Sequence, residues 1–149
     1  MNAPNETVTK ALQSTLVELI DLALVGKQAH WSVVGPQFRS IHLELDEIVD
    51  LARDQYDRVA ERLATIGVAP DGRAETVSTT SELQPVPPGF VAATDTVQRV
   101  TQVMDTIAVR MKERIIAVGD DDPVSQDILI GAMDELEKAA WMLRSQLTM

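Results

Sequence analysis

A long stretch without glycine or proline constrains the fold of this chain more than any other feature. It runs from residue 37 to residue 66, and both histidines of the chain lie in it or shortly before it. Apolar residues recur along it at helical spacing: Ile41, Leu45, Ile48, Ala52, Val59, Leu63 and Ile66. Because an α-helix repeats every 3.6 residues, this spacing predicts one long amphipathic helix.

Polar residues form a second row along the same predicted helix. At about 100° per residue, with His42 at zero, Asp46 lies at about 40°. Asp57 then lies at about 60° and Glu61 at about 100°, so four potential metal ligands share one face. Asp46 and Asp57 are about 16 Å apart along the axis, whereas metal–ligand bonds are about 2 Å long. Within one helix these residues therefore form two separate half-sites.

Each half-site lacks the ligands that would complete it. A second copy of the helix, antiparallel across a twofold axis, would supply them. The pair His42 and Asp46 of one chain would then face Asp57 and Glu61 of the other, twice over. The spacing predicts a metal site that exists only in an oligomer.

Composition limits the class of protein. With 149 residues and 45% hydrophobic residues, the chain is expected to form one domain, residues 1–149, with a sizeable core. It has no cysteine, which excludes disulfides and thiolate ligands and fits a reducing compartment. No signal-peptide pattern and no apolar run of about 20 residues is present, which favours a cytoplasmic protein without a membrane partner. The net charge of −10 favours cations over phosphate backbones as ligands.

The residues before the long helix predict another helix and a tight turn. Asn5 or Thr7 can cap this first helix, which is expected to reach about residue 34 with His30 on its inward face. Gly35 and Pro36 then break the chain. So short a connection folds the two helices antiparallel, which brings His30 near His42.

The second half of the chain predicts a crossover and two further helices. Residues 67–89 contain too many glycines and prolines for a full helix, although 75–83 can form a short one. A third helix is expected over 91–118, and Asp122 and Pro123 open a fourth as N-cap and first residue. No segment predicts a strand. The expected fold is all-α, a ferritin-like four-helix bundle with a long crossover between helices 2 and 3.

The ligand types favour a metal site over other chemistry. A lone histidine is more often a core residue, and an acidic pair is weak evidence in a chain with 23 acids. Here both histidines flank one turn, and His42 begins a His-x-x-x-Asp pair with Asp46. The acidic pair Asp57 and Glu61 lies in phase with it about three turns later. Imidazole combined with carboxylates suits Fe(II), Zn(II) or Mn(II). The Glu-x-x-His pairs of an intra-bundle di-iron centre are absent, as are a P-loop, a GxSxG motif and a cysteine nucleophile.

The sequence resembles the Dps proteins, or miniferritins, most closely their actinobacterial branch. The matching segments are KQAHWSVVGPQF, IHLELDE, AERLATIG and DPVSQDILIGAMDELEKAAWML. The resemblance implies a hollow homo-dodecamer with ferroxidase sites at its twofold interfaces. Carried over by motif position, the catalytic metal ligands are His30, His42 and Asp46 from one subunit with Asp57 and Glu61 from its partner.

The resemblance also implies a function. Family members bind Fe(II), oxidise it, usually faster with hydrogen peroxide than with oxygen, and store ferric mineral in the cavity, which protects against oxidative stress. Zinc is the expected substitute metal. Asp122 and Asp127 would line a threefold pore through which iron enters. Trp31 would either intercept an oxidising equivalent near the iron or pack the helix corner, and Trp141 is expected in the core or an interface.

The chain lacks the basic terminal tails through which many family members bind DNA. The first ten residues hold only Lys10 and the last ten only Arg144. Twelve copies would carry a formal charge of about −120, from −10 each, so DNA binding should be weak or absent. Two alternatives remain open: a nucleoid-associated, DNA-compacting protein with a secondary metal site, and a structural bundle with histidines at an interface.

Overall fold

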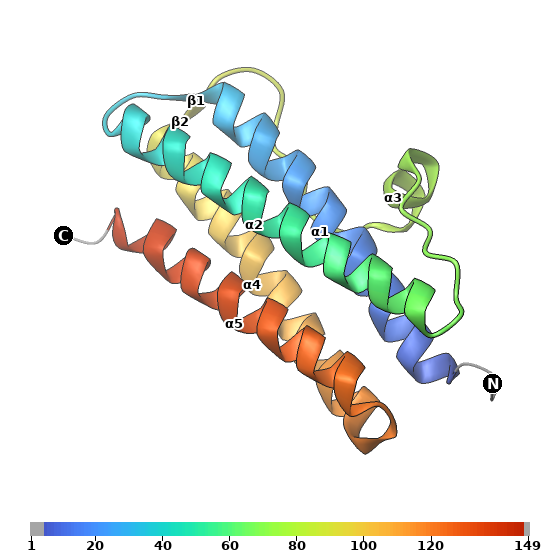
Figure 1. Cartoon of the computed structure of the whole chain (residues 1–149). Coiled ribbons are helices and arrows are strands. Elements are labelled where there is room, and N and C mark those ends of the chain that lie inside the picture. The colour runs from blue at the N-terminus through green and yellow to red at the C-terminus, as the bar shows by residue number, and fades with distance from the viewer. Residues whose placement is uncertain (1–4, 148–149) are drawn as a thin grey trace.

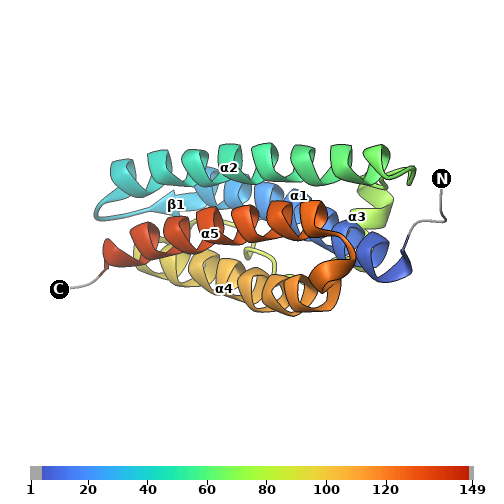
Figure 2. The ribbon, with the colours of Figure 1, turned by 60° about the horizontal axis from the view of Figure 1, so that its bottom comes forward.

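Four long helices form the bundle in the computed structural model, which describes residues 5–147. They are α1 (Glu6–Ser32), α2 (Phe38–Thr65), α4 (Ala93–Val118) and α5 (Pro123–Ser145). The hairpin of α1 and α2 lies against the hairpin of α4 and α5 (Figures 1 and 2). The expected all-α, ferritin-like bundle with its long crossover is confirmed.

The helix ends follow the expected capping chemistry. The side chain of Asn5, and not that of Thr7, caps α1 by accepting hydrogen bonds from two backbone N–H groups. Gly67 follows α2 with a φ of 84°, the left-handed conformation that glycine adopts most easily. Asp122 caps α5, and Pro123 occupies its first position as predicted.

Two short strands contradict the prediction that no segment forms a strand. Strand β1 (Val33–Val34) pairs in parallel with β2 (Val91–Ala92), and Val33 lies opposite Val91. Residues 33 and 34 had been expected to end the first helix. Parallel pairing needs a long connection, which α2 and the crossover provide. Two residues are too few to show an alternating pattern, so the sequence carries no signal for these strands.

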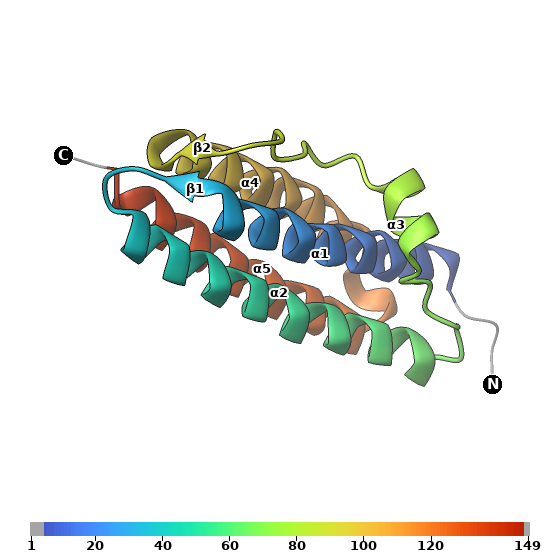
Figure 3. The ribbon, with the colours of Figure 1, turned by 90° about the horizontal axis from the view of Figure 1, so that it is seen from above.

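The crossover runs along α1 and contains the short helix α3 (Ala74–Thr80), within the region where one was expected (Figure 3). Just before α3, the side-chain amide of Gln13 on α1 binds the backbone of Asp71. It donates to the Asp71 carbonyl at 2.8 Å and accepts from the Asp71 N–H at 3.0 Å. Just after α3, the hydroxyl of Ser81 donates to the carboxylate of Asp21 on α1. These side-chain contacts attach a segment that has little regular structure of its own.

Helices α1 and α2 pack closely, and this closeness positions the histidines. A Cβ atom on Gly26 would lie 2.9 Å from Cγ2 of Val49, so a larger residue at this position would push the helices apart. The core contains these fully buried large side chains: Leu12, Leu16, Leu19, Leu22, Ile41, Leu45, Ile48, Leu63, Met104, Ile107, Met111 and Leu129. Over residues 5–147, no helix is long and apolar enough to cross a membrane.

Candidate metal centre

His30 and His42 form a hydrogen-bonded, stacked pair across the turn between α1 and α2. Nδ1 of His30 lies 2.7 Å from the backbone carbonyl oxygen of His42, and Nδ1 of His42 lies 2.8 Å from that of His30. The two rings stack with their centroids 3.6 Å apart and their planes 20° from parallel. His30 is only 7% exposed, which confirms that it lies on the inward face of its helix.

This pairing fixes which nitrogen of each ring can bind a metal. A carbonyl oxygen only accepts hydrogen bonds, so each Nδ1 must carry a hydrogen and donate. In the neutral ring the lone pair then lies on Nε2, and no residue between 5 and 147 forms a hydrogen bond with either Nε2 atom. Metal-binding histidines are commonly oriented by such a bond from their other nitrogen to a carbonyl. The pair is therefore organised to present two Nε2 ligands.

Asp46 lies beside this pair, one turn after His42 on α2. Its Oδ1 lies 3.5 Å from Nδ1 of His30 and accepts a hydrogen bond from the Lys27 ammonium. The bond from Lys27, helped by the nearby histidines, lowers the pKa of Asp46. The ammonium of Lys27 also occupies the space beside the one carboxylate of this half-site. The sequence reasoning missed Lys27, although it lies one helical turn before His30.

Asp57 and Glu61 form the other half-site, towards the far end of α2. Both are exposed, and neither carboxylate has a hydrogen bond or ion pair within residues 5–147. In the same part of the chain, no three His, Cys, Asp or Glu side chains come together to hold a metal ion. One chain thus carries the two half-sites separately, as the helix geometry requires. Their completion by a second copy stays a prediction.

A groove of about 430 Å³ lies beside Lys27, the ion-pair partner of Asp46, and Trp31 and Tyr56 line it. Trp31 is 65% exposed, so within this chain it does not pack the helix corner. Lys27 and Arg53 also line the groove. Trp141, at 63% exposure, is not in the core either, and its predicted place in an interface remains untested.

The two residues predicted for an iron pore lie in different environments. Both carboxylate oxygens of Asp122 accept hydrogen bonds from Nη2 of Arg62, at 2.8 and 2.9 Å, and Oδ2 also accepts one from the Ser125 hydroxyl. Although partial burial opposes ionisation, these bonds lower the pKa of Asp122. Asp127 is exposed on the first turns of α5. Sequence reasoning missed Arg62, whose partner lies 60 residues away.

Comparison with known proteins assigns the family. A model described as a ferritin-like domain matches residues 9–149. The fine tangled pili major subunit of Haemophilus ducreyi is 37% identical, over 97% of this chain and 77% of that protein. The DNA protection during starvation protein of Mycolicibacterium smegmatis is 35% identical, over 94% and 76%. The structure of Dps from Microbacterium arborescens in the high iron form covers 97% of each chain, with 30% identity and a TM-score of 0.90. The chain belongs to the Dps family.

The branch of the Dps family is not decided by these identities. The relatives from Haemophilus and Mycolicibacterium match at 37% and 35%, so the actinobacterial branch stays a prediction. Membership of the Dps family confirms the resemblance from which the site residues were predicted.

Lys27 is expected to limit cation binding by this Dps protein, because its ammonium holds Asp46 and repels a nearby metal ion. We expect Lys27→Gln to raise the pKa of Asp46 and to tighten Co(II) binding about 3- to 10-fold, the order expected for removing one neighbouring positive charge. Optical titration with Co(II), which reports imidazole ligation, measures the effect. Lys10→Gln, an exposed change on the same helix, is the control. Equal Co(II) affinity in the Lys27 variant and the wild type would show that Lys27 does not restrict the site.

Proposed function

We propose that this Dps protein is a cytoplasmic ferroxidase and iron-storage protein. It binds Fe(II) at sites shared by two subunits, oxidises it with hydrogen peroxide in preference to oxygen, and stores the ferric product inside a homo-dodecamer. The observation that carries the proposal is the histidine pair, whose Nδ1 atoms are both engaged by carbonyl oxygens and whose Nε2 atoms are both left for a metal.

Each ligand has a distinct role in this proposal. His30 and His42 bind the first Fe(II) as neutral imidazoles. Asp57 and Glu61 of the partner subunit add anionic oxygens, which favour the harder Fe(III) once it forms. Glu61 bridges to a second, weaker position near Asp46. That position is weaker because Lys27 already neutralises Asp46.

The chemistry balances with two iron ions and one peroxide. Each Fe(II) gives one electron, the O–O bond of hydrogen peroxide breaks, and two protons complete two water molecules. Because both electrons arrive together, no hydroxyl radical is released. Oxidation at such a site therefore removes both Fe(II) and hydrogen peroxide, the two reagents that together form hydroxyl radical. This is how the protein would protect DNA and other molecules against oxidative stress.

The comparisons and the surface support this proposal. The structure of the Microbacterium relative is described in a high iron form, and the Mycolicibacterium relative is named for DNA protection. The exposed Trp31 and the groove around it lie beside the half-site, where a partner subunit would cover them. The same donor set suits Zn(II), which would occupy the site without being oxidised.

We further propose that iron enters at a threefold axis. Asp122 and Asp127 would line a threefold pore in which three copies of each carboxylate concentrate cations. Arg62 neutralises much of the charge of Asp122. Asp127, which has no ion pair within residues 5–147, would then supply most of the attraction.

The proposal predicts a large loss of peroxide-driven oxidation in His42→Ala. The substitution removes one of the two imidazole ligands and its stacking on the His30 ring, while the backbone carbonyl of residue 42 that accepts from His30 remains. We therefore expect the rate to fall at least about 10-fold. Stopped-flow absorbance of ferric product after mixing Fe(II) protein with peroxide measures this rate. Asp95→Asn, an exposed change at the start of α4, should leave it unchanged. An undiminished rate in His42→Ala would refute the assigned ligands.

The alternative function is DNA compaction with a secondary metal site; several relatives are named for DNA protection. The net charge of −10 per chain argues against it, because like charges repel the phosphate backbone of DNA. We expect micromolar protein to leave linear DNA unshifted in a gel at low salt, where electrostatic binding is strongest. Tight retention that is lost at higher salt would instead support the DNA-binding function.

A further inference from the structure

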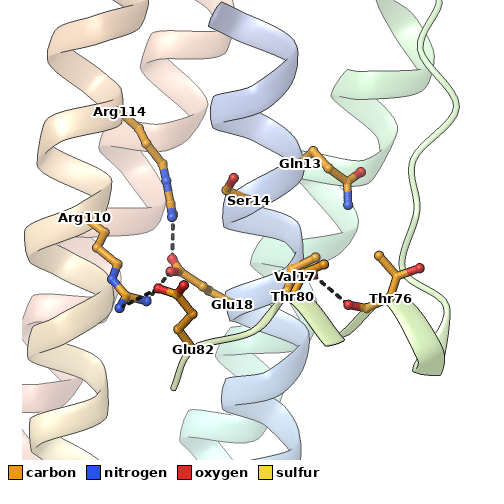
Figure 4. Close-up of a pocket in the computed structure, with 9 residues that line it drawn as sticks. All are labelled: Gln13, Ser14, Val17, Glu18, Thr76, Thr80, Glu82, Arg110 and Arg114. Carbon is orange, nitrogen blue, oxygen red and sulfur yellow. Dashed lines mark hydrogen bonds and ion pairs between the residues drawn. The ribbon is translucent and has the colours of Figure 1, made fainter. Parts of the chain in front are cut away.

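A polar cavity of about 380 Å³ lies on the face of the bundle formed by α1 and α4, partly covered by α3. It is separate from the half-sites on α2, and the proposed iron chemistry uses none of its residues. Figure 4 shows Arg110 and Arg114 reaching from α4 towards Glu18 on α1. Two arginines one helical turn apart repel each other unless an anion lies between them.

Glu18 is the fixed part of this cluster. Its side chain is only 6% exposed. One oxygen accepts from Nη1 of Arg110 at 2.8 Å, and the other accepts from Nη1 of Arg114 at 2.5 Å. A buried carboxylate with a guanidinium on each oxygen is held in place, because any movement of it breaks a charge-assisted hydrogen bond to one of the two arginines.

The two guanidinium groups keep unused donors. Each arginine has five N–H groups, and Glu18 takes one from each. Arg114 also donates from Nη1 to the Thr15 hydroxyl at 3.2 Å, but its Nε and Nη2 have no hydrogen bond within residues 5–147. The hydroxyl of Ser14, which also lines the cavity, has none in the same range. The cavity therefore holds several donors that have no acceptor within residues 5–147.

The remaining counter-charge is loosely held. Glu18 neutralises one of the two arginines, so one positive charge is left. Among residues 5–147, the only other carboxylate that lines the cavity is that of Glu82. Glu82 is 80% exposed, and its oxygen lies 3.5 Å from Nη2 of Arg110, longer than a normal hydrogen bond to a charged group. Such an exposed pair contributes little stability. A ligand from solution can take the place of Glu82.

We propose that this cavity is a binding site for a small oxyanion, which displaces Glu82 and binds Arg110 and Arg114. The planar guanidinium group matches the paired oxygens of a phosphate or a carboxylate, which makes arginine the usual residue for such anions. Ser14 supplies a further donor, and Glu18 holds both arginines in position before the ligand arrives.

The test uses the iron-free, assembled protein, so that phosphate cannot bind through iron and the result does not depend on ferroxidase activity. Isothermal titration calorimetry is run with inorganic phosphate and, separately, with acetate, at constant ionic strength in chloride. We expect one saturable site per chain for at least one anion. Binding of phosphate alone, acetate alone or both identifies the ligand class, and binding of neither overturns the proposal.

Two variants locate the site. Glu82→Gln removes the competing carboxylate and should tighten binding about 2- to 5-fold. Arg110→Gln leaves Glu18 paired with Arg114 and should weaken binding at least about 10-fold. If Arg110→Gln does not assemble, Arg110→Lys, which keeps the charge but not the fork, should weaken binding to a smaller extent.

Two further changes on α4 serve as matched controls. Glu113→Gln and Lys112→Gln are exposed changes outside the cavity and should leave anion affinity unchanged. Wild-type affinity in the Arg110 variants, or no tightening in Glu82→Gln, would contradict the displacement of Glu82 by the anion.

Discussion

The exchange of hydrogen bonds between His30 and His42 is the interaction on which the candidate metal centre depends. Each ring donates from Nδ1 to the other residue's carbonyl oxygen, so the orientation of each imidazole depends on the backbone that carries the other. This exchange requires α1 and α2 to lie close together, which the missing side chain at Gly26 allows. The short turn at residues 35–36 and the packing of two long helices therefore set the position of two nitrogen atoms.

The length of α2 separates the carboxylate ligands Asp57 and Glu61 from the histidine pair. Asp57 and Glu61 lie on the face that carries His42, but more than about four helical turns further along, where no histidine of the same chain is near. Because one chain does not bring these ligands together, the proposed function links metal binding to assembly. Under the proposed function, the metal and the subunit contact would stabilise each other, since an ion bound by both chains holds them together.

Much of this arrangement was predictable from local sequence. Helical periodicity, the caps at Asn5 and Asp122 and the turn before α2 depend on neighbouring residues, so the bundle and the nearness of the histidines followed from them. The parallel strands and the ion pair of Arg62 with Asp122 did not, because they join residues about 60 positions apart. Lys27 lay close in sequence to His30, but its contact with Asp46 depends on how α1 packs on α2. Periodicity does not specify that contact.

The most direct test of the shared site is complementation between two inactive variants. One carries His42→Ala, and the other carries Asp57→Asn with Glu61→Gln. Each is assembled alone, and the two are also co-assembled in equal amounts. If each site takes histidines from one chain and carboxylates from its twofold partner, random mixing restores intact ligand sets at about a quarter of the sites. The mixed protein should then oxidise Fe(II) with peroxide at about a quarter of the wild-type rate. A rate no higher than the mean of the two variants would contradict a site built from two subunits.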